Sequence, residues 1–369
     1  MNISVPHTLK WILPFLIITV AVIWAGVIIY KEPSTKNSSE ITTIIETQNL
    51  SIRIKAYRAL MERVGILEAQ ELLLRSGLPF TGETHLLNHT TGEYAYEKYG
   101  IGALQYCRNY FLSSCYHGAL IALIAAEGLQ VLPEVLEQCR SNPESTVYGQ
   151  CSHAVGHGLV AWFGYKNLPK ALEYCDTLRQ EIGPSFPSFN CYDGAFMENV
   201  WAIHDGGEPS PDRWVKENDP HFPCSSPIIK ESWRGGCWSN QPALLYQRFD
   251  GDIEHVAEIC NSLTDEKEKN ICFNGLARQV HPLTQGDPQR AVTYCTSFPE
   301  DRKLECAVAI AYADYSVGGR ALPAEICEHV ATNTRNSCYG RVVPLFKKDE
   351  CSLLREESAQ ESCVRQYLR

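Results

Sequence analysis

A unit that recurs along this chain is clearest in the stretch Cys151-Ser152-His153-Ala154-Val155-Gly156-His157-Gly158. A cysteine opens the segment, and two histidines follow it four residues apart. Residues at positions i and i+4 of a helix lie on one face, so His153 and His157 could bind the same ligand or metal ion. The same segment therefore contains both a cysteine of the repeating scaffold and two candidate metal ligands.

Short segments that end in cysteine repeat along the chain, which is typical of helical-repeat proteins. The segments are 103–107 (Ala-Leu-Gln-Tyr-Cys), 135–139 (Val-Leu-Glu-Gln-Cys), 171–175 (Ala-Leu-Glu-Tyr-Cys), 256–260 (Val-Ala-Glu-Ile-Cys) and 291–295 (Ala-Val-Thr-Tyr-Cys). A polar loop follows each segment, and then a second cysteine opens another apolar helix. Prolines such as Pro133 and Pro169 suit the first turn of the first helix. The pattern predicts a chain of helix pairs.

The sixteen cysteines form eight predicted disulfides, each joining the end of one helix to the start of the next. The predicted bridges are Cys107–Cys115, Cys139–Cys151, Cys175–Cys191, Cys224–Cys237, Cys260–Cys272, Cys295–Cys306, Cys327–Cys338 and Cys351–Cys363. In an antiparallel helix pair the last turn of one helix adjoins the first turn of the next, which brings the two cysteines within disulfide reach. Each bridge should contribute roughly 2–4 kcal/mol.

This arrangement resembles tetratricopeptide-type helical repeats, and more closely the cysteine-rich secreted SEL-like repeat proteins. The resemblance rests on units such as Ala-Leu-Gln-Tyr-Cys107 followed by Cys115-Tyr-His-Gly, and it covers residues 100–369 as a pattern. The loops vary in length, and the glycine after the second cysteine is present only in some repeats. The resemblance implies an all-α solenoid (an α/α superhelix) of disulfide-tied helix pairs. Such families are mostly binding scaffolds, so it implies no catalytic residues.

Residues 11–30 carry no charge and are almost wholly apolar, long enough to span a bilayer as one helix. A cleaved signal peptide is the alternative, but residues 28–33 offer no small-residue cleavage site. We therefore expect an N-terminal transmembrane anchor (a signal-anchor) at 11–30, a cytoplasmic tail at 1–10 and a polar stem at 31–50. Residues 51–369 would then form the α/α-repeat domain.

The cysteines also predict the localisation of the protein. A reducing cytosol would not normally keep such a framework as disulfides, so the bulk of the chain should be extracytoplasmic, in a periplasm, a secretory lumen or the cell exterior. The net charge of −10 argues against a nucleic-acid partner, whose phosphates call for a basic face. The expected partners are the membrane, through the anchor, and a protein or peptide on the repeat surface.

Alignment of the repeats on their second cysteine reveals a row of polar residues two positions later. The row consists of His117, His153, Asp193, Ser239 and Asn274, and it is followed by Val308 and Gly340. Equivalent positions of a solenoid line up on one surface, so these residues should lie side by side. A second histidine pair one helical turn apart, His85 and His89, lies in a predicted helix that runs towards Gly100.

Imidazole ligands suit Zn, Cu, Fe or Ni, and this row therefore predicts a transition-metal site. Its expected ligands are His85, His89, His117, His153, His157 and Asp193, and glycines 118, 156, 158 and 194 would let the helices approach closely. A three-histidine site with an open position could acidify a bound water, with Glu198 as the candidate catalytic proton acceptor. The alternative is that these histidines cap helices or form buried hydrogen bonds. The cysteines are not expected to bind metal, since zinc ribbons place two of them about two to four residues apart.

The function class remains open between a metal enzyme, a metal-binding protein and a non-enzymatic binding scaffold. Residues 201–236 interrupt the repeats with aromatic residues and prolines, and such an insertion often shapes a binding surface. Trp214 and Trp233 would be its anchors for a peptide or protein. Asp250-Gly251-Asp252 resembles the paired aspartates of some Golgi transferases, but it stands where a repeat begins, so we expect a helix cap there.

Overall fold

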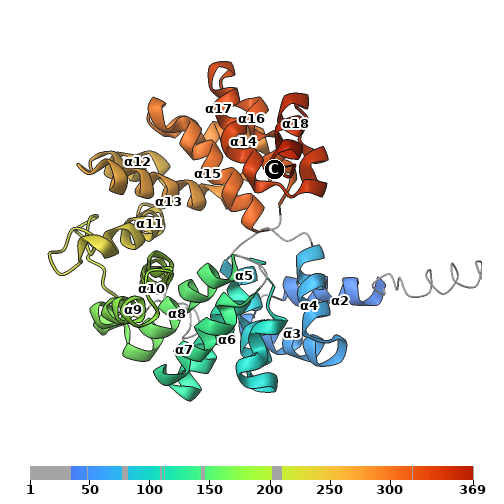
Figure 1. Ribbon diagram of the computed structural model, residues 1–369, viewed down its shortest axis with the longest axis vertical. Helices are drawn as coiled ribbons and strands as arrows, with labels where there is room; N and C mark the ends of the chain where they lie inside the picture. The colour runs from blue at the N-terminus through green and yellow to red at the C-terminus, as the bar shows by residue number, and fades with distance from the viewer. Residues whose placement is uncertain are drawn as a thin grey trace, which may run out of the picture. The chain divides into compact units, whose positions relative to one another are not determined.

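The computed structural model describes residues 35–47, 49–76, 82–108, 110–111, 113–142, 146–201, 210–317 and 319–368 (Figure 1). Every regular element within these ranges is a helix. The predicted cytoplasmic tail and transmembrane anchor, residues 1–30, lie outside the described residues. The chain divides into two compact units, residues 1–57 and 58–369.

The first unit contains helix α2 (Thr35–Glu46) and the beginning of α3 (Leu50–Val64). Helix α2 forms within the segment expected to be a polar stem. Ile41 and Ile44 are both buried, and their spacing of three residues places them on one helix face. The three isoleucines of this polar segment, Ile41, Ile44 and Ile45, are too few to reveal a helical period in the sequence.

The second unit begins within α3, which is followed by α4 (Ile66–Arg75) and α5 (Gly82–Tyr99). Apolar residues recur at helical spacing from Ile54 to Leu73, and Gly77 and Pro79 form a stop signal, so the sequence predicts one helix from Ser51 to Ser76. The structure has two. The break lies at Gly65, whose φ of 91° is a left-handed conformation that glycine adopts with little strain. The predicted helix that carries His85 and His89 and runs towards Gly100 is confirmed as α5.

The rest of the second unit alternates longer helices with short 3₁₀ turns. Its elements are η1 (Gly100–Tyr106), α6 (Ser114–Glu127), η2 (Leu129–Val131), α7 (Leu132–Arg140), α8 (Val147–Phe163), η3 (Tyr165–Asn167), α9 (Leu168–Ile182), α10 (Ser188–Trp201), α11 (Glu231–Arg248), α12 (Ile253–Asn261), α13 (Glu266–Thr284), α14 (Pro288–Tyr294), η5 (Cys295–Ser297), η6 (Glu300–Arg302), α15 (Lys303–Ser316), α16 (Ala321–His329), η7 (Thr332–Thr334), α17 (Arg335–Val342), η8 (Val343–Leu345), η9 (Lys348–Leu353) and α18 (Glu357–Arg365). The cap predicted at Asp250-Gly251-Asp252 is present, because the Asp252 side chain accepts a hydrogen bond from the backbone N–H of His255. Asp287 caps α14 in the same way, by accepting from the backbone N–H of Arg290.

One row of helices runs through the second unit by successive contacts. It is called the central row here, and its order is α5, α6, α8, α10, α11, α13, α15 and α17. The shorter helices pack beside it, α7 against α8, α9 between α8 and α10, and α12 between α11 and α13. Helix α14 packs between α13 and α15, and α16 packs between α15 and α17. The helices of the central row carry all of the aligned polar residues, from His117 on α6 to Asn274 on α13, so these helices position the candidate site.

All eight predicted disulfides are confirmed. The bridges are Cys107–Cys115, Cys139–Cys151, Cys175–Cys191, Cys224–Cys237, Cys260–Cys272, Cys295–Cys306, Cys327–Cys338 and Cys351–Cys363. Most of them join the end of one helix to the start of the next. Cys224 departs from this rule because it lies in the turns before α11, Cys175 because it lies in the middle of α9, and Cys363 because it lies near the end of α18. The all-helical, disulfide-tied array fits the cysteine-rich type of helical repeat.

No single helix in the described ranges has the length and apolar content needed to cross a membrane. The segments Ser114–Glu127 and Leu129–Arg140 reach that length and composition only together, across a bend of 119°.

Candidate metal centre

Five histidines from three helices of the central row converge on one place. His85 and His89 come from α5, His117 from α6, and His153 and His157 from α8. Neighbouring ring centroids lie between 4.6 and 5.2 Å apart. The two histidine pairs and the aligned His117 thus form one group, called the histidine cluster below.

Close contacts between helix backbones hold these histidines near one another. A Cβ atom on Gly118 of α6 would lie 2.0 Å from the carbonyl oxygen of His89 on α5, and one on Gly194 of α10 would lie 1.9 Å from that of His153 on α8. Glycine allows the helices to come this near. A Cβ atom on Gly156 would likewise lie 2.1 Å from the carbonyl oxygen of Cys191, whereas one on Gly158 would lie 2.3 Å from a side-chain atom of Ile124. The predicted close approach of helices is confirmed at glycines 118, 156 and 194, and at Gly158 the absent side chain leaves room for Ile124.

The first histidine group consists of His85, His89 and His117. His85 Nδ1 lies 2.9 Å from the carbonyl oxygen of Phe111. Because a carbonyl oxygen only accepts, Nδ1 of His85 carries the proton and Nε2 of the neutral ring is an acceptor. This Nε2 lies 3.1 Å from His89 Nε2, which in turn lies 3.3 Å from His117 Nδ1. Three ring nitrogens therefore meet within hydrogen-bonding distance.

The second group consists of His153 and His157, with His117 against them. His157 Nδ1 lies 2.8 Å from Glu198 Oε2, and His153 Nδ1 lies 3.1 Å from Asp193 Oδ2. Ionised carboxylates accept hydrogen bonds, so each Nδ1 carries a proton and each Nε2 of a neutral ring carries a lone pair. The two Nε2 atoms are only 3.1 Å apart. Two ring nitrogens at this distance are satisfied by a proton on one of them or by a metal ion between them.

Both carboxylates behind this pair are buried in the structure. Burial raises the pKa of Asp193, but the hydrogen bond from His153, the positive charge of Arg278 and the Ser239 hydroxyl lower it further, so the pKa stays well below its usual range. Asn240 also donates to Asp193, over 2.9 Å. The second oxygen of Glu198 accepts a hydrogen bond from the Tyr165 hydroxyl. The lowered pKa of Asp193 leaves a buried negative charge beside His153, and both oxygens of Glu198 face donors, one of them His157. This environment favours a cation near the two rings.

His117 lies at the centre of the cluster and is completely buried. Desolvation, followed by the neighbouring His157, His153, His89 and His85, lowers the pKa of His117 well below 6.5. Its ring is therefore neutral at pH 7, and it stacks on that of His157 with 4.6 Å between centroids. The Nδ1 atom faces His89, whereas the Nε2 atom has no hydrogen-bond partner among the residues that the structure describes. A buried nitrogen without a partner is costly unless something binds it.

The geometry fits metal ions with three nitrogen ligands each. His85, His89 and His117 form one group and His117, His153 and His157 another, and the ligand atoms in each lie within 4.8 Å of one another. Two nitrogens bound at ~2.0–2.1 Å to one tetrahedral ion lie ~3.3 Å apart, which matches the distances of 3.1 and 3.3 Å found here.

The predicted site residues all come together, although not all as direct ligands. Asp193 and Glu198 contact the Nδ1 atoms of His153 and His157, which places them behind the rings and away from the facing Nε2 atoms. Sequence reasoning missed Tyr165, Asn240 and the carbonyl group of Phe111. No periodic spacing links these residues to the histidines, and the sequence offers no signal for them.

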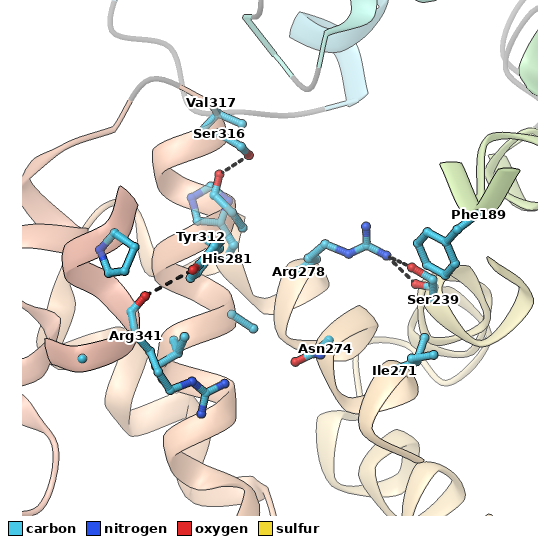
Figure 2. A pocket seen from close by; sticks show the side chains of 15 residues that line it. Phe189, Ser239, Ile271, Asn274, Arg278, His281, Tyr312, Ser316, Val317 and Arg341 are labelled. Carbon is cyan, nitrogen blue, oxygen red and sulfur yellow. Dashed lines mark hydrogen bonds between the residues drawn. The ribbon is translucent and has the colours of Figure 1, made fainter. Parts of the chain in front are cut away.

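A cavity of about 720 Å³ lies further along the central row. Ser239, Asn274, Val308 and Gly340, which continue the aligned row, all line it. Figure 2 shows the side chain of Arg278 directed at Ser239, near Phe189 and Ile271. The guanidinium donates to the Ser239 carbonyl oxygen over 2.7 Å. The polar row therefore passes from the histidine cluster into an open cavity.

The aromatic insertion differs from its prediction. Trp233 is buried, its ring lies near that of Tyr192, and its indole N–H donates to Asp176 over 3.1 Å. It is a core residue, so the hypothesis that Trp233 is an exposed binding anchor is wrong. Trp214 is partly exposed and donates to the carbonyl oxygen of Lys166 over 3.0 Å. Residues 202–209 of the insertion lie outside the described chain.

Comparison with known proteins identifies no relative. No protein-family model matches the chain, and no curated protein or solved structure is significantly similar to it.

Proposed function

We propose that the histidine cluster is a transition-metal centre in an extracytoplasmic protein. The observation that carries this proposal is the pair of Nε2 atoms of His153 and His157, which face each other at 3.1 Å while both Nδ1 atoms face carboxylates. Metal-binding histidines are commonly fixed by a carboxylate or carbonyl on their other nitrogen. The eight disulfides support the extracytoplasmic location.

The ligand set favours Zn, Cu, Fe or Ni, because imidazole suits these ions. Three histidines per ion leave an open coordination position, which a water molecule or substrate can occupy, as in catalytic sites. Glu198 reaches the centre through His157, so we assign it the role of positioning that ring. This assignment replaces the direct proton transfer that the sequence suggested for Glu198.

The scaffold that we propose for this centre is a solenoid of disulfide-tied helix pairs, anchored by a transmembrane helix at residues 11–30. Successive contacts along the central row and the uncharged apolar run in the sequence support the two parts of this proposal. In such a solenoid the aligned positions of neighbouring repeats fall side by side, which explains how α5, α6 and α8 supply one cluster.

The test is metal analysis of the full-length protein, purified in detergent without chelators. We expect tightly bound transition metal, and a double variant, His153→Ala with His157→Ala, should lose the metal that these two rings hold while keeping its helical circular dichroism. Free metal at about a hundredfold excess over Kd should stabilise the wild type by about 2.7 kcal/mol. Absence of metal, together with no thermal stabilisation by Zn, Cu, Fe or Ni, would refute the proposal.

A binding scaffold is the second candidate, and the cavity beside Ser239 is the observation in its favour. Its volume of about 720 Å³ falls within the range of roughly 300–1,000 Å³ for small-molecule pockets. Arg278 and Arg341 line it together with apolar side chains, so a peptide with a free carboxylate is the class of ligand that fits. Titration with short C-terminal peptides, followed by nuclear magnetic resonance, should show binding that Arg278→Ala abolishes.

A further inference from the structure

His117 belongs to both histidine groups, and no other residue of the cluster does. The remaining four histidines divide into two pairs, His85 with His89 and His153 with His157, each on one helix. The His117 ring is in contact with both pairs, with centroid distances of 5.2 Å to His85 and His89, 5.0 Å to His153 and 4.6 Å to His157. It therefore occupies the position of a shared ligand.

We infer that the centre is dinuclear, with the imidazole of His117 bridging two transition-metal ions. The Nδ1 atom would bind the ion held by His85 and His89, and the Nε2 atom would bind the ion held by His153 and His157. This inference rests on the proposed metal-binding function and adds to it the number of ions and the identity of the bridge.

A single ion cannot use all five rings. An ion near His117 Nδ1, where His89 Nε2 lies at 3.3 Å, leaves the Nε2 atom of His117 buried without a partner. It also leaves the Nε2 atoms of His153 and His157 facing each other at 3.1 Å. An ion on each nitrogen of His117, with bonds of ~2.0–2.1 Å, resolves both problems and places the two ions about 6 Å apart.

The bridge requires His117 to give up a proton. A neutral imidazole has one N–H and one acceptor nitrogen, so the second ion binds as the N–H proton leaves for solvent. The negative charge of the resulting imidazolate lies between the two positive ions, which reduces their mutual repulsion. No oxidant, reductant or further reactant is needed for this step.

The two sites are not equivalent in charge. The rings of His153 and His157 are held by the carboxylates of Asp193 and Glu198, whereas His85 is held by the neutral carbonyl group of Phe111. Carboxylate partners raise the basicity of metal-binding histidines, and loss of such a partner typically costs 10–100-fold in affinity. The ion between His153 and His157 should therefore bind first, and the ion between His85 and His89 second.

The experiment is a Cu²⁺ titration of the demetallated full-length protein, followed by metal analysis and electron paramagnetic resonance. We expect two ions per chain. The Cu²⁺ signal should grow with the first ion and then lose most of its intensity with the second, because an imidazolate bridge couples the two unpaired electrons. The double variants His85→Ala/His89→Ala and His153→Ala/His157→Ala should each bind one ion with an undiminished signal.

His117→Ala removes the bridge, and any copper that this variant binds should give the full signal per ion. The matched control is His255→Ala, which removes a half-exposed surface histidine and should leave two coupled ions. One ion per chain in the wild type would overturn the dinuclear inference and leave the metal-binding function intact. No bound ion would overturn both, and two ions with an undiminished signal would overturn the bridge.

Discussion

Two regions of the second unit share the same arrangement of disulfide-tied helices, but one contains the histidine cluster and the other contains the cavity. The first region runs from α5 to α10 and the second from α11 to α17. In both, disulfide-tied helix pairs place equivalent sequence positions side by side along the central row. In the first region these positions are His117, His153 and Asp193, and all three are buried in the histidine cluster. In the second region they are Ser239, Asn274, Val308 and Gly340, which line the cavity. The scaffold thus fixes the position, and the side chain there decides between a metal centre and a pocket.

Close helix contact does not by itself make the cluster. The second region has such a contact too, because a Cβ atom on Gly275 would lie 2.4 Å from the carbonyl oxygen of Ser239. It also has a buried histidine paired with a carboxylate, since His281 Nε2 lies 3.0 Å from Asp314 Oδ1. Among the described residues, neither metal-ligand group includes His281. The convergence of several ring nitrogens is what distinguishes the first region.

The largest effect should come from filling the close helix contact in the first region. In Gly118→Ala the new Cβ would meet the His89 carbonyl oxygen at 2.0 Å, so α5 and α6 must separate. We expect a loss of about 3 kcal/mol or more, together with loss of bound metal. Urea unfolding and metal analysis would measure the two effects.

The matched variant in the second region is Gly340→Ala, because no atom lies within 4 Å of its Cβ position. Alanine is favoured over glycine within a helix by roughly 0.5–1 kcal/mol, so this variant should be as stable as the wild type or slightly more stable. If Gly118→Ala behaved like Gly340→Ala, the close contact would not be what organises the cluster.

The next effect concerns the disulfides of the two regions. Cys139–Cys151 holds the start of α8, which carries His153, and Cys327–Cys338 holds the start of α17. Replacing both cysteines of either bridge with alanine should cost about 3 kcal/mol. Chemical unfolding should give similar losses for the two variants, whereas calorimetric titration should show weaker metal binding only without Cys139–Cys151. Equal metal affinities would show that the bridge contributes stability alone.

A smaller effect should separate the two buried histidine–carboxylate pairs. Glu198→Gln removes the charge that fixes His157, so metal affinity should fall by about 10–100-fold. Asp314→Asn alters the pair with His281 and should leave metal affinity unchanged, with a stability cost of about 1–3 kcal/mol. Competition with a chromophoric chelator would give both affinities. An unchanged affinity in Glu198→Gln would contradict its role in positioning His157.

The smallest effect concerns acid sensitivity just after the second region, at Glu350 in η9. Burial raises the pKa of Glu350, but hydrogen bonds from the Tyr315 hydroxyl, the Lys347 backbone and Arg320 lower it from 4.5 to about 2. A carboxyl group with a lowered pKa stabilises the fold above its ordinary pKa and loses this contribution as the pH falls. The stability difference between wild type and Glu350→Gln should thus be constant above pH 4.5 and shrink towards pH 2. A difference independent of pH would rule out this contribution.

The sequence predicts the scaffold better than the site. The disulfides follow from the cysteine spacing, because a helix pair brings neighbouring cysteines together whatever the rest of the fold does. The pairing of His153 with His157 follows from helical periodicity. The partner of His157, Glu198, lies 41 residues away, and no local rule specifies which nitrogen it would contact. The merging of both groups through His117 depends likewise on the approach of α6 to α5 and α8, a tertiary feature.

The most direct test of the central claim is an anomalous difference map from crystals of the metal-loaded protein, measured at the absorption edge of the bound metal. We predict a strong peak between the Nε2 atoms of His153 and His157, with Asp193 and Glu198 still on their Nδ1 atoms. A second peak should lie among His85, His89 and His117. No peak at either position, with the two Nε2 atoms still about 3 Å apart and sharing a proton, would contradict the metal centre.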